Sequence, residues 1–194
     1  MAFNVTEEGI TCLAQYAQVS IGFQVESILQ VELVEGGLGG FRLHEQKLAT
    51  PYWKDYANDE LGTTVDWPAM FDLSGWGHFL AWQDSALAGA AAVAFDTPGV
   101  NMLEGRTDLS VLWDIRVQPE FRGMGAGRQL FQAAADWSRQ RGCKLMKIET
   151  QNVNVPACRF YARMGCRLGV IDRFAYRAQP KVSDEVMLLW FLEL

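Results

Sequence analysis

The alternation of hydrophobic and polar positions is clearest in the second half of the chain. Residues Leu109–Val117 form an apolar, β-rich run that predicts a buried strand. From Gly125 to Arg141 apolar residues recur at helical spacing, and Gly142 is placed to end that helix. Residues Lys144–Gln151 predict another strand, and Pro156 suits the first turn of a further helix. The pattern therefore predicts strand, helix, strand and helix in close succession.

Further strands are predicted on both sides of this stretch. Trp76–Trp82 and Ala86–Phe95 are two apolar runs separated by a short polar turn. The second run is almost continuously apolar, which is typical of a strand buried on both faces. Near the end of the chain, Arg167–Tyr176 and Glu185–Leu192 predict the last two strands.

The N-terminal part of the chain is harder to interpret from its pattern. Ser20–Val34 is rich in β-branched residues and predicts a strand, whereas Thr64–Phe71 suits a short helix. Glu7–Val19 fits either a short helix or a loop, and Pro51 argues against one long helix over Phe41–Tyr56. The order of elements predicts a mixed α/β fold in which helices cover a mainly antiparallel sheet. A length of 194 residues is typical of one domain, so we expect a single domain over residues 1–194.

A glycine-rich turn separates the strand that ends at Val117 from the helix that follows it. Residues 122–127 read R-G-M-G-A-G. Glycines let the backbone approach a ligand closely, and the free N–H groups at the start of a helix attract anions. The dinucleotide fingerprint does not fit, because Arg128 stands where its third glycine belongs, and the P-loop pattern is absent. The turn therefore predicts a phosphate-bearing ligand of another kind.

Charge is distributed unevenly along the chain. Residues 1–114 hold 4 Lys and Arg against 16 Asp and Glu, whereas residues 115–194 hold 13 against 7. The basic half contains the glycine-rich turn and suits a polyanionic cosubstrate, and the acidic half could attract a cationic acceptor. A net charge of −6 argues against nucleic acid as a partner.

The remaining composition narrows the class of protein further. No run approaches the roughly 20 apolar residues that span a bilayer, and the N-terminus lacks the features of a signal peptide, so we expect no membrane partner. The 4 cysteines form no C-x-x-C pair, and no histidine lies near them in sequence. We therefore expect reduced thiols in the cytoplasm and no metal site.

Two motifs carry a resemblance to a known family. The R-x-x-G-x-G pattern at residues 122–127, directly after D-I-R-V-Q-P at residues 114–119, resembles the acetyl-CoA pyrophosphate loop of the GNAT superfamily of N-acetyltransferases. N-x-N-x-P-A-x-x-F-Y-x-x-x-G-C at residues 152–166 is similar to a second region of that superfamily. WDIRV at residues 113–117 and KIETQN at residues 147–152 look like the streptothricin acetyltransferase branch.

The resemblance implies a fold and a cosubstrate. It implies the GNAT fold, in which the central sheet is splayed between its fourth and fifth strands and the pantetheine arm of acetyl-CoA lies in the gap. The backbone of the central strand would bind the arm, and the glycine-rich turn would hold the pyrophosphate. The residues implied to bind the cosubstrate are Ile115, Arg116, Val117, Arg122, Gly123, Met124, Gly125, Ala126, Gly127, Arg128, Asn154 and Tyr161.

Acyl transfer also needs groups that move protons. Tyr161 stands where the family has the acid that protonates the leaving thiolate; the alternative is that it is only a core aromatic beside Phe160. Asp114 and Glu149 are candidates for a base that delivers a neutral amine, or else they are structural partners in ion pairs or hydrogen bonds. Asn154 could instead form local hydrogen bonds where a helix begins. Side chains that could cradle a cationic acceptor, or simply pack the fold, are Tyr52, Trp53, Asp55 and Tyr56.

These observations predict a cytoplasmic, acetyl-CoA-dependent N-acetyltransferase that acts on a primary amine of a streptothricin-type antibiotic. Two alternatives stay open at this point. The acceptor could be another amine, such as a polyamine, an amino acid or a protein N-terminus, or the chain could be a non-catalytic acyl-CoA-binding module. The apolar run at residues 186–192 could fill the core or border a homodimer.

Overall fold

The computed structural model describes residues 2–56 and 63–194 and divides the chain into two compact units. The described part of the first unit runs to Gly22, resumes at Asp55 as far as Ile148, and includes Leu192–Leu194. The second unit consists of Phe23–Lys54 and Glu149–Phe191. The assignment of residues 1–194 to one domain stays a prediction.

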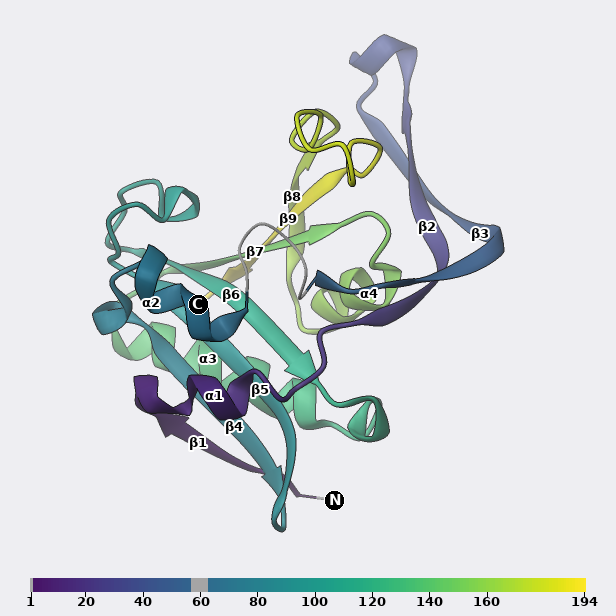
Figure 1. Cartoon of the computed structure of the whole chain (residues 1–194). Coiled ribbons are helices and arrows are strands. Elements are labelled where there is room, and N and C mark those ends of the chain that lie inside the picture. The colour runs from purple at the N-terminus through teal and green to yellow at the C-terminus, as the bar shows by residue number, and fades with distance from the viewer. Residues whose placement is uncertain (1, 57–62) are drawn as a thin grey trace. The chain divides into compact units, whose positions relative to one another are not determined.

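The described chain runs through strands β1 to β9, with α-helices only between some of them (Figure 1). The strands are β1 (Asn4–Glu8), β2 (Phe23–Leu33), β3 (Phe41–Lys54), β4 (Gly77–Gln83), β5 (Ala86–Phe95), β6 (Leu109–Val117), β7 (Leu145–Gln151), β8 (Arg167–Asp172) and β9 (Met187–Glu193). The α-helices are α1 (Leu13–Tyr16), α2 (Trp67–Met70), α3 (Ala126–Gln140) and α4 (Val155–Arg163). Short 3₁₀ turns include η1 (Ile10–Cys12), η4 (Thr64–Asp66), η5 (Leu73–Gly75) and η7 (Pro119–Phe121). Within the described ranges, no helix has the length and apolarity to cross a bilayer.

The first unit is built on a sheet with helices on both faces. Its strands lie in the order β1-β4-β5-β6-β7, and all neighbours are antiparallel except β6 and β7. In Figure 1, α1 and α2 lie on one face of these strands and α3 on the other. α3 approaches β4 closely, because a Cβ on Gly77 would lie 2.6 Å from the Trp137 ring. Mixed α/β architecture with a mainly antiparallel sheet is thereby confirmed.

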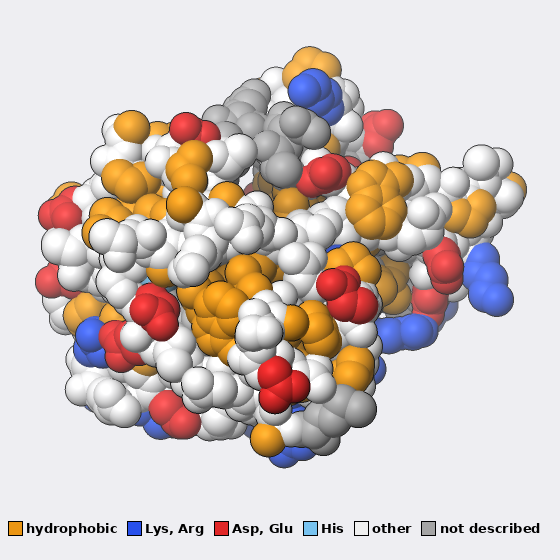
Figure 2. Space-filling view, turned by 60° about the horizontal axis from the view of Figure 1, so that its bottom comes forward, with side chains coloured by type: hydrophobic (Ala, Val, Ile, Leu, Met, Phe, Trp, Pro, Cys, Tyr) orange, Lys and Arg blue, Asp and Glu red, His pale blue; other side chains and the backbone are white. Residues whose placement is uncertain are grey.

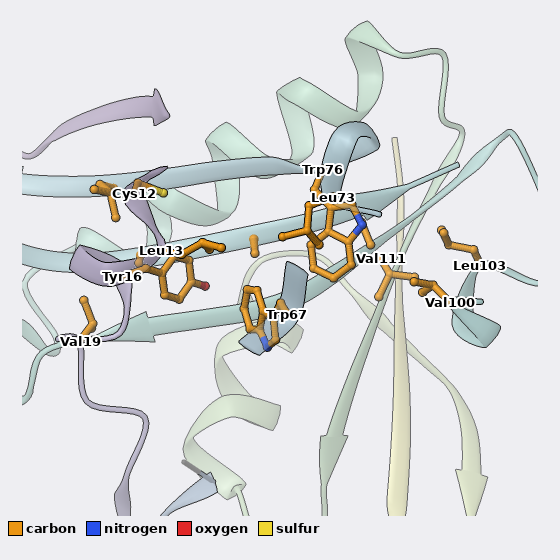
Figure 3. Packing of buried hydrophobic residues seen from close by; sticks show 14 residues of the cluster. Cys12, Leu13, Tyr16, Val19, Trp67, Leu73, Trp76, Val100, Leu103 and Val111 are labelled. Atoms are coloured by element: carbon orange, nitrogen blue, oxygen red, sulfur yellow. The ribbon is translucent and has the colours of Figure 1, made fainter. Parts of the chain in front are cut away.

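An apolar cluster of the first unit lies between the sheet and its two short helices. Tyr16, Trp67 and Trp76 contribute large buried rings, and strand residues such as Ala92 leave room for them (Figure 3). The Tyr16 and Trp67 rings meet edge-on with centroids 5.6 Å apart. The alanine-rich sequence of β5 therefore has a structural reason. Its small side chains let aromatic rings from α1 and α2 rest on the sheet.

The pairing of β6 with β7 ends halfway along β6. Leu109–Leu112 pair in parallel with Leu145–Ile148, and no pair follows Leu112. On its other side β6 stays paired with β5, with a register shift opposite Ala92 and Val93 that leaves Trp113 as an extra residue. Counted in sheet order, β6 and β7 are the fourth and fifth strands, so the predicted splay is confirmed at this position.

The second unit contains a long hairpin and the C-terminal strands. β2 and β3 form a two-stranded antiparallel ribbon, and β8 pairs with β9. Pro51 lies inside β3, where the register shifts between Val25 and Ser27 and the ladder is interrupted. A proline is tolerated there because no partner needs its missing N–H.

Most predicted elements agree with the structure, and two N-terminal strands were missed. The predicted strands at Leu109–Val117 and Ala86–Phe95 match β6 and β5 exactly in extent, and the helices after Gly125 and at Pro156 are confirmed. β1 lies where no strand was expected, because its sequence NVTEE has one apolar residue. β3 was not recognised because Pro51 interrupts a mostly exposed ribbon that has no buried face to impose alternation.

Candidate functional site

The glycine-rich turn joins β6 to α3 through η7. Gly123 has φ of +78° and Gly125, the N-cap of α3, has φ of +103°. L-residues with side chains rarely adopt these values, which explains the glycines. A Cβ built on either residue would meet nothing within 4 Å, so the space beside the turn is open. These positions fit a ligand that approaches the main chain.

The N-terminus of α3 has the features of an anion-binding site. No side chain caps it, and its first turn contains no acidic residue. The first N–H groups of any α-helix lack partners within the helix, and the helix dipole makes that end positive. Because α3 has 15 residues, its dipole is well developed. The backbone of residues 123–128 is thus suited to a diphosphate.

Arg122 braces this turn from within the first unit. Its Nε donates to the Val117 carbonyl at 3.0 Å, and its Nη2 donates to the Gly22 carbonyl at 2.8 Å. These bonds hold the guanidinium against the end of β6. Arg128, in the first turn of α3, is exposed and can approach a bound anion. Direct phosphate contacts by either arginine stay predictions.

The free edge of β6 begins at its bulge. Residues Trp113–Val117 lie beyond the last pair with β7, so main-chain groups on that edge have no partner on β7. Ile115, Arg116 and Val117, which the resemblance implied, all belong to this segment. An extended thioester arm could pair with such an edge as a further strand would.

The side chains of Asp114 and Arg116 are bound to each other rather than turned to solvent. Arg116 Nε lies 2.8 Å from Asp114 Oδ1, and its Nη2 lies 2.9 Å from Oδ2. Tyr16, which is fully buried, donates its hydroxyl to Asp114 Oδ1 at 2.7 Å. Burial raises the pKa of Tyr16 well above its ordinary value, and the Asp114 charge adds to this. The phenol therefore stays protonated as a donor.

Glu149 has a different partner in the second unit. The Tyr176 hydroxyl donates to Glu149 Oε1 at 2.6 Å, and Gln151 Nε2 donates to the same hydroxyl at 2.8 Å. Glu149 and Gln151 stand on one face of β7, because side chains alternate along a strand. Tyr176 is buried and comes after β8. Neither Tyr16 nor Tyr176 was predicted from the sequence, because neither lies within a motif.

Asn154 and Tyr161 belong to α4. Asn154 is its N-cap, and Oδ1 accepts from the Ala157 N–H at 3.2 Å. Asn154 therefore forms the local hydrogen bond that was one of the two expectations for it. Tyr161 is 6% exposed, and its ring packs against Phe160 at 5.5 Å and Trp190 at 6.5 Å. Cosubstrate contacts by Asn154 and the acid role of Tyr161 stay predictions.

The four residues predicted to cradle the acceptor are divided between the units. Tyr52 and Trp53 are neighbours on β3, 42% and 55% exposed, and their side chains point to opposite faces of the ribbon. Asp55 and Tyr56 belong to the first unit, where the Asp55 charge acts on Arg116. The structure therefore does not gather these four side chains on one surface of either unit.

No group of three or more potential metal ligands occurs within residues 2–56 and 63–194. The sequence has 2 histidines, His44 on β3 and His78 on β4, which belong to different units.

Comparison with known proteins gives consistent matches. A model of the acetyltransferase (GNAT) family matches residues 42–166. Streptothricin acetyltransferase of Escherichia coli is 31% identical over 87% of this chain and 84% of that protein. The crystal structure of nourseothricin acetyltransferase gives a TM-score of 0.76 at 25% identity, covering 100% of this chain and 99% of that one.

A second solved structure agrees in fold. A Bacillus anthracis str. Ames protein assigned as a streptothricin acetyltransferase, crystallised with acetyl coenzyme A, gives a TM-score of 0.77. It is 21% identical and covers 100% of both chains. At that identity the likeness concerns the fold, and it extends over the whole of both chains.

Proposed function

Given that this chain belongs to the GNAT family of acetyltransferases and is an acetyl-CoA-dependent N-acetyltransferase, we propose that its acceptor is the primary amine of a streptothricin-type antibiotic. The observation that carries the proposal is 31% identity with the Escherichia coli streptothricin acetyltransferase over 87% of this chain. The excess of acidic residues in the N-terminal half suits a cationic acceptor. Figure 2 shows acidic side chains beside an exposed hydrophobic patch.

The glycine-rich turn is proposed to hold the diphosphate of acetyl-CoA. Gly123 and Gly125 leave open space beside the main chain, and α3 begins with uncapped N–H groups. Anions bind such helix ends through backbone donors and the helix dipole. The pantetheine arm is proposed to lie along the free edge of β6, where the main-chain groups of Ile115 and the Val117 N–H have no partner on β7. The Val117 carbonyl already accepts from Arg122.

Glu149 is the better candidate for the base. The amine must lose a proton, because an unperturbed alkylamine with a pKa near 10.4 is almost fully protonated at neutral pH. Glu149 accepts from a neutral phenol, whereas Asp114 is paired in a fork with Arg116. We therefore assign proton removal to Glu149, directly or through water, and assign to Asp114 a positioning role beneath the bulge of β6.

Transfer then follows from simple bond changes. The nitrogen lone pair attacks the thioester carbonyl carbon, and the carbonyl oxygen becomes an oxyanion. Backbone N–H groups on the free edge of β6 are suited to stabilise that oxyanion. Collapse breaks the carbon–sulfur bond, and the thiolate takes a proton for which Tyr161 is the proposed donor. The nitrogen of the new amide gives up its extra proton in the same step, and that proton, relayed through water, restores the Tyr161 phenol.

The role of Tyr161 has a simple test. Tyr161→Phe keeps the ring that packs against Phe160 and Trp190 and removes only the hydroxyl. A general acid contributes about 100-fold or more, so we expect a fall in kcat of that size with KM for acetyl-CoA little changed. A kcat within twofold of the unmodified enzyme would rule out the acid role.

Reduced thiols support a cytoplasmic location as part of the proposal. All 4 cysteines are free and buried in the structure. Burial raises the pKa of Cys158 and Cys166 to about 12, so both stay protonated and unreactive. Such a set of thiols is typical of proteins from a reducing compartment.

The acceptor is tested by measuring release of free coenzyme A thiol with a panel of amines. Streptothricin should give the highest kcat/KM, above polyamines, amino acid amides and peptides with free N-termini. Higher kcat/KM with any of the other amines would overturn the acceptor proposal and leave the acetyltransferase assignment in place.

A further inference from the structure

A pocket that no motif indicates lies in the first unit, away from the glycine-rich turn. It has a volume of about 550 Å³ and is bounded by the end of β1, by α2 and η5, and by the start of β4. Its walls combine aromatic rings with carboxylates. Its lining includes Glu8, Phe71, Asp72, Trp76 and His78.

His78 gives this pocket a polar atom without a partner. The residue is 2% exposed, and Nε2 is buried with no hydrogen-bond partner among the residues that the structure describes. Burial also lowers the pKa of His78, so the imidazole is neutral at pH 7. Buried polar groups in native proteins almost always have partners, and an unpaired one in a pocket wall points to a ligand. A neutral imidazole can accept a hydrogen bond at Nε2 from such a ligand.

The charges around the pocket indicate the charge of that ligand. Glu8 and Asp72 are the charged residues of the lining, and no ion pair to either occurs within the described ranges. A backbone hydrogen bond from Ser74 lowers the pKa of Asp72, which therefore stays ionised. Phe71 and Trp76 stack at 5.8 Å with an interplanar angle of 29° and present aromatic faces. Carboxylates and aromatic faces together favour an organic cation.

The pocket is connected to the free edge of β6 through aromatic contacts. Trp113, the extra residue of the bulge, lies 5.2 Å from the Phe71 ring and 5.2 Å from the Trp76 ring. His78 pairs with Ala92, which pairs with Asp114. Directly paired residues share a face of a sheet, so His78 and Asp114 face the same side, roughly 10 Å apart across two strand spacings.

We propose that this pocket binds an ammonium-bearing part of the acceptor, with the ammonium N–H donating to His78 Nε2 and the lining carboxylates of Glu8 and Asp72 balancing its charge. The inference rests on the proposed function and extends it from the class of acceptor to the residues that select it. It also explains why a buried imidazole nitrogen without a protein partner is kept beside two stacked aromatic rings.

The first test observes His78 directly and needs no catalysis. Long-range proton–nitrogen NMR spectra of the full chain contain two imidazoles, and His44, whose side chain is 44% exposed on β3, serves as the internal control. Butylamine should shift the His78 Nε2 signal saturably, whereas butanol and butyrate of equal chain length should not. No shift with butylamine, or equal shifts with all three, would overturn the proposal.

The second test uses variants that keep the local structure. His78→Phe keeps a ring beside Trp76 and removes Nε2, and Asp72→Asn keeps an acceptor for the Ser74 N–H. Each should raise KM for the amine about tenfold, with kcat within twofold and KM for acetyl-CoA unchanged. Asp84→Asn is the control, because it removes a charge at the far end of β4, at φ of +52°, which asparagine tolerates.

The outcomes separate this inference from the proposed function. If both variants leave KM for the amine unchanged, the pocket does not bind the acceptor, whichever amine is the substrate. If another amine replaces streptothricin as the best substrate, the proposed acceptor is wrong. The NMR and KM results with that amine then support or overturn the pocket by themselves.

Discussion

Each unit of this protein contains a carboxylate that accepts a hydrogen bond from a buried tyrosine. The two carboxylates differ in the other groups that surround them. In the first unit, Tyr16 donates to Asp114 at 2.7 Å, and Arg116 forms a two-point ion pair with the same carboxylate. In the second unit, Tyr176 donates to Glu149 at 2.6 Å, and its own oxygen accepts from Gln151. Similar tyrosine–carboxylate pairs therefore belong to different electrostatic surroundings.

This difference is the reason why we propose a structural role for Asp114 and a chemical role for Glu149. In a buried ion pair between a carboxylate and a guanidinium, removal of one partner leaves the other charge buried and strongly lowers the free energy of unfolding. A carboxylate held by a neutral phenol keeps its orientation and can still take a proton. The hydrogen bond from a tyrosine does not distinguish Asp114 from Glu149. The position of Arg116, two residues after Asp114 on β6, does distinguish them.

The largest expected effect is on stability, from Asp114→Ala. The substitution leaves Arg116, whose side chain is 9% exposed, without its partner. Removing one member of a buried ion pair costs about 3–5 kcal/mol, whereas Glu149→Ala should cost only about 1 kcal/mol for its hydrogen bond. Urea denaturation measures both. Equal losses for the two variants would contradict the distinction between the sites.

The next effect is on catalysis, from Glu149→Gln. The amide keeps an oxygen that accepts from Tyr176 and removes the proton acceptor for the amine. We expect kcat at neutral pH to fall about 100-fold, which corresponds to about 2.7 kcal/mol, with a free energy of unfolding close to the original. Steady-state thiol release checks this. Activity within threefold of the unmodified enzyme would show that another group removes the proton.

A smaller effect is expected at the glycine-rich turn. Gly125→Ala and Gly99→Ala place a Cβ at φ of +103° and +86°, with nothing within 4 Å in either case. Both should lose about 1 kcal/mol of stability through backbone strain. Only Gly125→Ala should also raise KM for acetyl-CoA, by about tenfold. A matching rise with Gly99→Ala would mean that strain, rather than contact with the cosubstrate, causes the effect.

The smallest effect is a pH dependence of stability from the buried thiols. Burial raises the pKa of Cys158 from 9.0 to about 12, so the folded chain binds this proton more tightly than the unfolded chain. The contribution is present below pH 9 and is lost as pH rises toward 12. Between pH 8 and 9.5 the free energy of unfolding should fall by about 0.8 kcal/mol for this thiol.

The matched variant for the thiol prediction is Cys158→Ala. Its absolute stability is lower because a buried group is lost, so the comparison concerns the slope with pH. Urea denaturation at several pH values should show a shallower fall for the variant. An unchanged slope would mean that the thiol keeps its ordinary pKa in the folded chain.

The sequence predicted the local framework of the fold because its cues were local. The run at Leu109–Val117, the glycines at residues 123–127 and the helical stripe of α3 each depend on a few neighbouring residues. β3 and β1 were missed because their pattern depends on partners far along the chain, including the register shift that accommodates Pro51.

The candidate site was predictable only where a motif carried it. The glycine-rich turn was found because its backbone geometry requires a particular residue type. Tyr16 lies 98 residues before its partner Asp114, and Tyr176 lies 27 residues after Glu149, so neither pairing leaves a mark in local sequence. The role proposed for His78 leaves no local mark either, since it depends on a folded pocket in which Nε2 has no partner among the described residues.

The central claim is that main-chain N–H groups of the turn at residues 123–128 bind the diphosphate of acetyl-CoA. A crystal structure of the full chain grown with coenzyme A tests it most directly. The account predicts phosphate oxygens within hydrogen-bond distance of backbone nitrogens of Gly125 and its neighbours, with the arm along the free edge of β6. A diphosphate bound elsewhere on the molecule, with the turn unoccupied, would contradict it.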